Sequence, residues 1–151
     1  MKGQASAEYL VMLAIVLVVA LIAVLLLSGG SQVDAATLSQ SSTYWAGSAK
    51  PLSIQQWGQA NDTLYLDITN QGLDHLFLRQ VRVDNVTADL GEGWSWKSGG
   101  TKTISIPGLP PCDVNSYDSY RYNVTLIYDS ENIPGQIERG EKPVLGYCTT
   151  L

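Results

Sequence analysis

The residues best suited to chemistry in this chain are three asparagines, each followed two positions later by a threonine. Asn61, Asn85 and Asn123 each begin an Asn-x-Thr triplet whose middle residue is not proline. Such a triplet is the acceptor for N-glycosylation, in which the side-chain amide of the asparagine receives a glycan. The three triplets predict an exported domain that carries a glycan on at least one of these asparagines.

The two cysteines, Cys112 and Cys148, are the next candidates. They lie far apart in sequence, without the spacing of a zinc site and without a histidine nearby. An even pair in an exported domain predicts one disulfide, and two free buried thiols are the alternative. Closing a loop of this size would stabilise the fold by roughly 4 kcal/mol in the chain-entropy model.

Patterns typical of catalysis or metal binding are lacking in the rest of the sequence. The single histidine, His75, follows Asp74 after a glycine turn, with no serine motif or phosphate-binding loop near it. This context favours a surface or turn histidine over a general base. The acids do not have the spacing of a calcium loop, although a calcium ion in a loop is a minor alternative. We expect no enzyme activity, no catalytic or metal-binding residue and no cofactor.

Three tryptophans raise the possibility of a surface that stacks on sugars. Trp94 and Trp96 lie in a Gly-Trp-Ser-Trp sequence, and Trp57 precedes them in the chain. Large aromatic side chains more often pack in a core or at a subunit contact. We therefore favour a packing role for these residues over sugar binding.

An acid stands at the edge of a long apolar segment near the N-terminus. Glu8 comes just before residues 10–27, which contain no charged side chain. A carboxylate in this position costs free energy unless something compensates it. It can lie in the headgroup layer or interact with the positive end of its own helix dipole. It can also pair with a positive group on a neighbouring helix.

The apolar segment has the length of a membrane span. Its 18 residues would form a helix about 27 Å long, close to the hydrocarbon thickness of a bilayer. A secretory signal peptide would have a shorter apolar centre and a cleavage site after it, whereas this segment runs into Ser28-Gly29-Gly30-Ser31. We predict that it stays on the protein. Because it is apolar on all sides, it suits lipid first and a bundle of like helices later.

A short motif precedes this segment. Lys2 and Gly3 are followed by Gln4, and then by Ser6 and Glu8 at alternate positions. With the long apolar helix behind it, this pattern resembles the class III signal peptide of archaeal type IV pilin-like proteins, over about the first thirty residues. The leucine that the family usually has eight residues after the glutamine is Met12 here. The aromatic start of bacterial type IV pilins and the Gly-rich start of archaellins are both lacking.

The resemblance implies a processing step and a set of partners. Residues 1–3 would be a leader that a prepilin peptidase removes by cutting between Gly3 and Gln4. The new amine of Gln4 could then compensate Glu8 between neighbouring helices, unless Gln4 cyclises and loses its charge. The other implied partners are the pilus assembly machinery, the membrane before assembly, and further copies of the chain in a helical filament.

The segment between the apolar run and Pro51 is polar. Val33, Thr37, Gln40 and Tyr44 recur at helical spacing, although the run from Ser39 to Thr43 has poor helix propensity. We expect the first helix to continue past a soft point at Gly29-Gly30 and to reach about Trp45. A flexible stalk is the alternative.

From about Leu52 onward, the hydrophobic pattern has period two, with turn residues between short runs. We expect a bulge near Arg79-Gln80, and one long strand from Tyr120 to Tyr128 with Asn123 on its polar face. The predicted fold class is α+β: a long N-terminal hydrophobic helix followed by an all-β head, an immunoglobulin-like β-sandwich. The predicted domains are the leader 1–3, the assembly or transmembrane helix with its stalk 4–50, and an extracellular head 51–151.

Charge argues against nucleic acid as a partner. The first fifty residues are neutral, so the net charge of −5 falls on the head, and no basic patch appears in it. The resemblance implies a structural pilin subunit at the cell surface, held in the cytoplasmic membrane as a precursor and used for adhesion. The alternatives are a membrane-anchored adhesion or ligand-binding ectodomain and a minor pilin.

Overall fold

The computed structural model describes the backbone of residues 4–28 and 33–150, and the side chains of residues 7–24 and 33–150. The chain forms two compact units that meet between residues 32 and 33, and each is described by itself. Gly3 of the predicted leader and the predicted soft point at Gly29-Gly30 lie outside the described residues.

The first unit is the helix α1, Gln4–Ser28. Its 25 residues contain no glycine or proline, so nothing interrupts the hydrogen-bond ladder over roughly 37 Å. The side chains from Ala7 to Val24 are all exposed. The predicted hydrophobic helix is confirmed as an uninterrupted apolar rod.

The second unit begins with the helix α2, Ala35–Thr43, which continues directly into a π-helical turn, η1, at Tyr44–Ser48. Asp34 caps α2, because its Oδ1 accepts the Thr37 backbone N–H at 2.6 Å. Hydrogen bonds from the side chain and backbone of Thr37 lower the pKa of Asp34. The segment is therefore helical to Ser48, despite its poor intrinsic propensity.

Packing against the β-strands explains why this segment is a helix. Trp45 is 0% exposed, and its indole N–H donates to the Lys142 carbonyl at 2.8 Å. The Ser41 hydroxyl donates to the Pro143 carbonyl. A side chain at Gly140 would collide with the Trp45 ring, so glycine is required there. Residues 33–50, which the sequence analysis grouped with the stalk, thus belong to the compact unit of the head.

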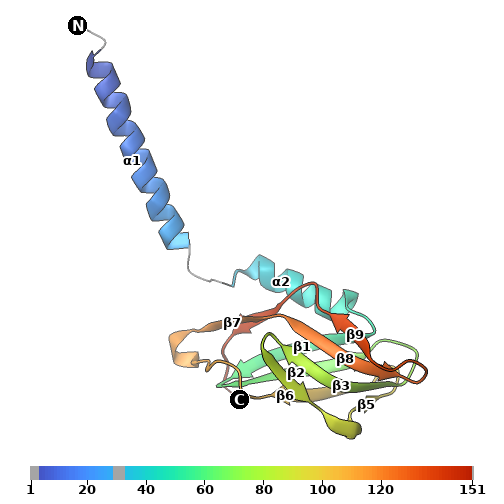
Figure 1. The fold of residues 1–151 in the computed structure, drawn as a ribbon. Coiled ribbons are helices and arrows are strands. Elements are labelled where there is room, and N and C mark those ends of the chain that lie inside the picture. Colours follow the sequence, from blue (N-terminus) through green and yellow to red (C-terminus); the bar gives the residue numbers. More distant parts are fainter. Residues whose placement is uncertain (1–3, 29–32, 151) are drawn as a thin grey trace. The chain divides into compact units, whose positions relative to one another are not determined.

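The head consists of three antiparallel sheets (Figure 1). One has the order β1-β2-β6, a second pairs β10 with β7, and the third has the order β4-β3-β8-β9 with β5 also paired to β3. Two 3-10 turns, η2 and η3, connect strands. The bounds are β1 Leu52–Ala60, β2 Thr63–Asn70, β3 Leu76–Val83, β4 Val86–Asp89, η2 Gly91–Gly93, β5 Ser95–Trp96, β6 Thr101–Ile106, η3 Val114–Ser116, β7 Ser119–Tyr122, β8 Val124–Ser130, β9 Gln136–Arg139 and β10 Val144–Tyr147.

One hydrophobic core unites these sheets. Leu64, Leu66 and Ile68 on β2 are buried and alternate with partly exposed residues, as the period-two pattern predicted. The same core cluster includes side chains from β3, β6, β8 and β10 and the ring of Trp45. The predicted fold class is confirmed as an apolar helix followed by a mostly antiparallel β head. The immunoglobulin-like arrangement stays a prediction.

Two strand predictions can be compared in detail. The bulge near Arg79-Gln80 is confirmed, because the pairing of β3 with β8 shifts register between Leu78 and Gln80. The predicted strand from Tyr120 to Tyr128 is instead two strands, which divide at Asn123. Its first part pairs with β10 and its second part with β3 and β9, although the inward and outward alternation continues through both.

Candidate assembly and modification sites

The apolar helix α1 is the candidate assembly surface. It contains the one candidate membrane span among the described residues, Ala7–Val24, judged by length and composition. Its exposed side chains are almost all aliphatic, so the helix offers no polar stripe that would mark a water-facing side. Such a surface is satisfied by lipid or by other apolar helices.

Glu8 interrupts this surface close to its start. It is exposed and lies four residues after Gln4, the first residue of α1. Residues four apart lie on the same helix face, and helical side chains tilt toward the N-terminus. The Glu8 carboxylate therefore leans toward the position where a cut after Gly3 would create a new amine. The cleavage site itself stays a prediction, since Gly3 and the Gln4 side chain are not described.

Two of the three glycosylation acceptors lie around one carboxylate. Asn123 donates to Oδ1 of Asp84 twice, with its backbone N–H at 2.8 Å and its side-chain Nδ2 at 3.2 Å. Asp84 has a positive φ of 47° in the turn that joins β3 to β4, a conformation that Asp and Asn tolerate. Asn85 follows it in the same turn and is exposed. Both acceptors border one open hollow, together with Arg82 and Thr125.

The third acceptor, Asn61, is exposed in the turn that joins β1 to β2, with a φ of 53°. Its backbone carbonyl accepts the Cys112 N–H at 2.9 Å and the Gln59 Nε2 at 2.9 Å. The backbone at this acceptor is thus held from two directions while its side chain faces solvent. All three predicted acceptors are at the surface of the folded head, and none is shown to carry a glycan.

The acceptors differ in how their threonines are placed. Thr87 is exposed on β4, which pairs only with β3 and so forms an edge of its sheet. Thr63 is half-buried at the start of β2. Thr125 is half-buried on β8, which has β3 on one side and β9 on the other. A glycosylating enzyme that must hold the whole triplet reaches Asn85 most easily and Asn123 least easily.

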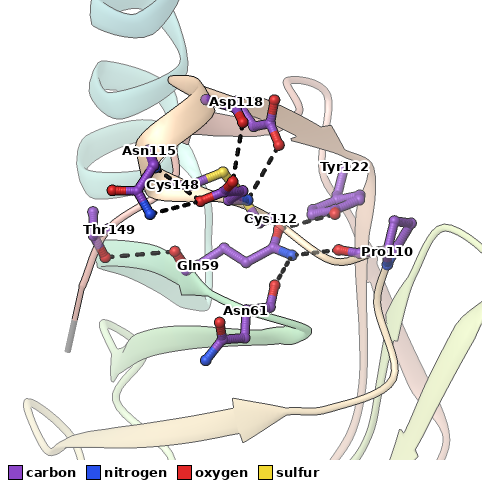
Figure 2. The surroundings of a disulfide bond; sticks show 11 residues. Gln59, Asn61, Pro110, Cys112, Asn115, Asp118, Tyr122, Cys148 and Thr149 are labelled. Carbon is purple, nitrogen blue, oxygen red and sulfur yellow. Dashed lines mark hydrogen bonds between the residues drawn. A yellow bond between two sulfur atoms is a disulfide. The ribbon is translucent and has the colours of Figure 1, made fainter.

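The disulfide between Cys112 and Cys148 is present, with Cα atoms 5.6 Å apart, as predicted. Figure 2 shows that Gln59 forms several hydrogen bonds in the surroundings of this disulfide. The buried Gln59 side chain donates to the carbonyls of Asn61 and Pro110 and accepts the hydroxyl of Tyr122. These bonds fix the segment before Cys112 beside β1, so the disulfide closes onto a region that is already rigid.

The remaining sequence candidates have packing roles. His75 stacks on Phe77 at 4.8 Å between ring centroids, and the Arg79 guanidinium lies over the same ring. Trp96 is buried and donates its indole N–H to the Ile68 carbonyl, while Trp57 packs against the core. Within residues 4–28 and 33–150, no group of three or more His, Cys, Asp or Glu side chains is arranged to hold a metal ion.

Sequence reasoning missed Glu138, which is 8% exposed on β9. Its Oε2 accepts the Leu52 backbone N–H at 3.0 Å, whereas its Oε1 has no hydrogen-bond partner among the described residues. Burial raises the pKa of Glu138 to about 7, against the opposing effect of the bond from Leu52. Its neighbour Ile137 is exposed, so the local pattern gives the opposite of the usual signal for burial.

Comparison with protein-family models gives a match at the N-terminus. The family model for the class III signal peptide matches residues 2–27, which include Gly3, Gln4 and Glu8 and most of α1. The comparison with curated proteins produced no match. The matched segment supports a type IV pilin-like protein, with processing by a prepilin peptidase, a membrane-anchored precursor and export to the surface.

Proposed function

We propose that this type IV pilin-like chain is the structural subunit of an archaeal surface filament of the type IV pilus class, and that it serves adhesion. The observation that carries the proposal is the coincidence of two features in one segment. Residues 2–27 match the class III signal peptide, and the same residues form an apolar helix with every described side chain from Ala7 to Val24 exposed. A helix of this kind is suited to processing, storage in a membrane and assembly.

Assembly follows from the physics of α1. In the membrane the helix is solvated by lipid, and in a bundle the same aliphatic surface packs against copies of itself. Contacts between different faces of neighbouring copies propagate as a helical filament when their rotation does not close into a ring. Cleavage after Gly3 would supply an amine for Glu8 of a neighbouring subunit, which removes the penalty of an unpaired carboxylate at this depth.

The head gives the filament its outer surface. It carries the whole net charge of −5 and has three exposed glycan acceptors, which suits a soluble, glycosylated exterior. We propose assembly and adhesion rather than catalysis as its work. A membrane-anchored ectodomain and a minor subunit of a filament share these features, and the experiment below separates the anchor from the filament.

The test is N-terminal peptide mass spectrometry on filaments sheared from native cells and separated from membranes. A chain that begins at Gln4, or at its cyclised form, in the filament fraction is the expected result. A chain that keeps Met1 and occurs only in membranes would replace the filament subunit by an anchored ectodomain.

A further inference from the structure

Two neighbouring hollows lie at the outer face of the sheet β1-β2-β6, on the side opposite the core. On β2, Leu64 and Leu66 point inward, so Tyr65 and Asp67 point outward. Two hollows of about 490 and 400 Å³ lie here, and Tyr65 and Thr149 line both of them. We call these two neighbouring hollows together the Tyr65 groove.

The first half of the Tyr65 groove combines aromatic residues with hydrogen-bonding groups. Besides Tyr65 and Thr149, it is lined by residues from all three strands: Gln56, Trp57, Gly58, Asp67 and Thr103. Trp57 lies opposite the buried Leu66 in the pairing of β1 with β2, so it is on the inner face, and its indole N–H donates to the Leu145 carbonyl. Tyr65 is the aromatic residue on the outward face. The Thr103 hydroxyl donates to Oδ1 of Asp67, so the carboxylate is held in place and keeps further lone pairs for a ligand.

Gly58 gives this half its depth. It lies opposite Tyr65 in the pairing of β1 with β2. A Cβ at Gly58 would meet only the Thr149 hydroxyl, at 3.7 Å, so the space beside the Tyr65 ring is open rather than filled by protein. The result is a shallow depression with the Tyr65 ring on one side and polar groups around it.

The second half, beyond Tyr65, is acidic. It is lined by Asp62 and Asp113 together with the acceptor Asn61 and the disulfide residue Cys112. Hydrogen bonds from the Asn115 backbone and the Ser116 side chain lower the pKa of Asp113. None of the described residues that line either half is basic. Anionic ligands, including uronic acids and phosphates, are therefore disfavoured along the whole groove.

We infer that the Tyr65 groove binds a neutral saccharide. The C–H face of a sugar packs on an aromatic ring, as apolar surface does. Its hydroxyls can donate to Asp67 and exchange hydrogen bonds with Gln56 and the threonines. A few polar groups placed in this way fix the orientation of a ligand and provide specificity. The inference names a class of ligand for the proposed adhesion role. Saccharide binding by the groove does not depend on that role, and only its biological purpose rests on the proposed function.

Asn61 sets one condition for the measurement. It lines the acidic half of the groove, so a glycan attached to it would compete with a free saccharide for the same surface. The protein is therefore made in a host without N-glycosylation, as the full chain in detergent micelles. Binding is then measured independently of filament formation, so failure of the groove and failure of the filament proposal give separate results.

The experiment is saturation-transfer NMR with maltotriose, cellotriose, mannotriose and chitotriose, and with trigalacturonate as an anionic counterpart. At least one neutral trisaccharide should show saturation transfer, and trigalacturonate should show less. Tyr65→Ala removes the ring, and Gly58→Val fills the depression with a residue that strands favour. Each should weaken binding roughly tenfold or more. Tyr117→Asn, which removes an exposed tyrosine outside the groove, is the matched control and should bind normally.

The inference is overturned if none of the four neutral trisaccharides binds the wild-type chain. It is also overturned if trigalacturonate binds best. A third contrary result is unchanged binding in both Tyr65→Ala and Gly58→Val. The two variants change the groove in opposite ways, one by deletion and one by filling, so a folding defect in one leaves the other to decide.

Discussion

The two units of this chain deal with apolar surface in opposite ways. In the head, the aliphatic side chains of β2 are 0% exposed, and buried polar groups such as Gln59 have specific partners. In α1, the aliphatic side chains from Leu10 to Val24 are all exposed. The head buries its apolar side chains within its own fold, whereas those of α1 must be covered by lipid or by other helices.

This difference shows where specificity must reside. Along α1, one aliphatic contact resembles the next, so in the proposed filament the aliphatic surface alone would hold helices together without a defined register. Glu8 is the described charged residue that interrupts it, and a charge in an apolar setting has few acceptable positions. In the head, by contrast, many individual contacts share the work of specifying one structure.

The largest effect is expected from Glu8→Gln, which tests whether this charge gives α1 its specificity in assembly. The substitution keeps the size and polarity of the side chain but removes the charge that would pair with the Gln4 amine. We expect filament yield to fall by about tenfold or more, because losing a buried pair partner is strongly unfavourable. Membrane insertion should be unchanged. Both are measured by immunoblotting of the sheared and membrane fractions.

The matched control is Glu92→Gln, an exposed acid in the η2 turn of the head, which should assemble normally. Normal filament yield from Glu8→Gln would reject the pairing role and leave Glu8 as a headgroup-layer residue or a partner of its own helix dipole.

The next largest effect is expected from Trp45→Ala, which tests whether packing of α2 and η1 stabilises the head. Removing this buried ring leaves a cavity and the Lys142 carbonyl without its donor. We expect a loss of about 3 to 5 kcal/mol in the free energy of unfolding of the head. Urea unfolding followed by tryptophan fluorescence measures it.

Ser42→Ala, on an exposed position of α2, should change stability by a few tenths of a kcal/mol at most. If Trp45→Ala were equally mild, residues 33–50 would contribute little to the stability of the head and would act as the flexible stalk that is the alternative to a continuous helix.

A smaller, pH-dependent effect is expected from Glu138→Gln. The folded-state pKa of Glu138 is raised from 4.5 to about 7, so the folded head binds this proton more tightly than the unfolded chain does. The contribution of Glu138 to the stability of the wild-type head should therefore be fully present below pH 4.5, and about 3 kcal/mol of it should be lost as the pH rises to 7. Glu138→Gln stays neutral, so its stability should vary less over this window and exceed that of the wild type at pH 8.

Urea unfolding at pH 5.0, 6.5 and 8.0 tests this prediction. The control Glu141→Gln, at an exposed acid two residues after β9, should keep the wild-type pH dependence. A Glu138→Gln head with the same pH dependence as the wild type would mean that Glu138 ionises normally in the folded state.

Sequence reasoning succeeded where the signal is local and periodic. The apolar run predicts α1, the period-two pattern predicts the strands, and the parity change between Leu78 and Val81 predicts the bulge of β3. The motif from Gly3 to Glu8 could also be recognised, because it is a short linear motif and lies within the segment that matches the family model.

The features that the sequence did not reveal depend on contacts between distant segments. The Ser39–Thr43 run is helical because Ser41 and Trp45 dock on the loop after β9. The division of the 120–128 segment at Asn123 depends on the carboxylate of Asp84, which is 39 residues away. Glu138 is buried beside an exposed isoleucine, a pattern that no periodicity would suggest. The Tyr65 groove forms only where three strands meet the C-terminal segment.

The smallest expected effect concerns which acceptors carry glycans, and it leaves stability almost unchanged. If the glycan is added to the folded head, occupancy should be highest at Asn85 in its exposed turn and lowest at Asn123. The Nδ2 of Asn123, the atom that would receive the glycan, already donates to Asp84, and Thr125 lies on a strand paired on both sides.

Glycopeptide mass spectrometry of native protein measures all three occupancies. Asp84→Ala should raise the occupancy of Asn123 by freeing its amide, whereas Asp89→Ala, at an exposed acid on the edge strand β4, should not. High occupancy of Asn123 in the wild type would mean that the glycan is added before β8 pairs with its neighbours, so that the unfolded chain, rather than the finished head, is the enzyme's substrate.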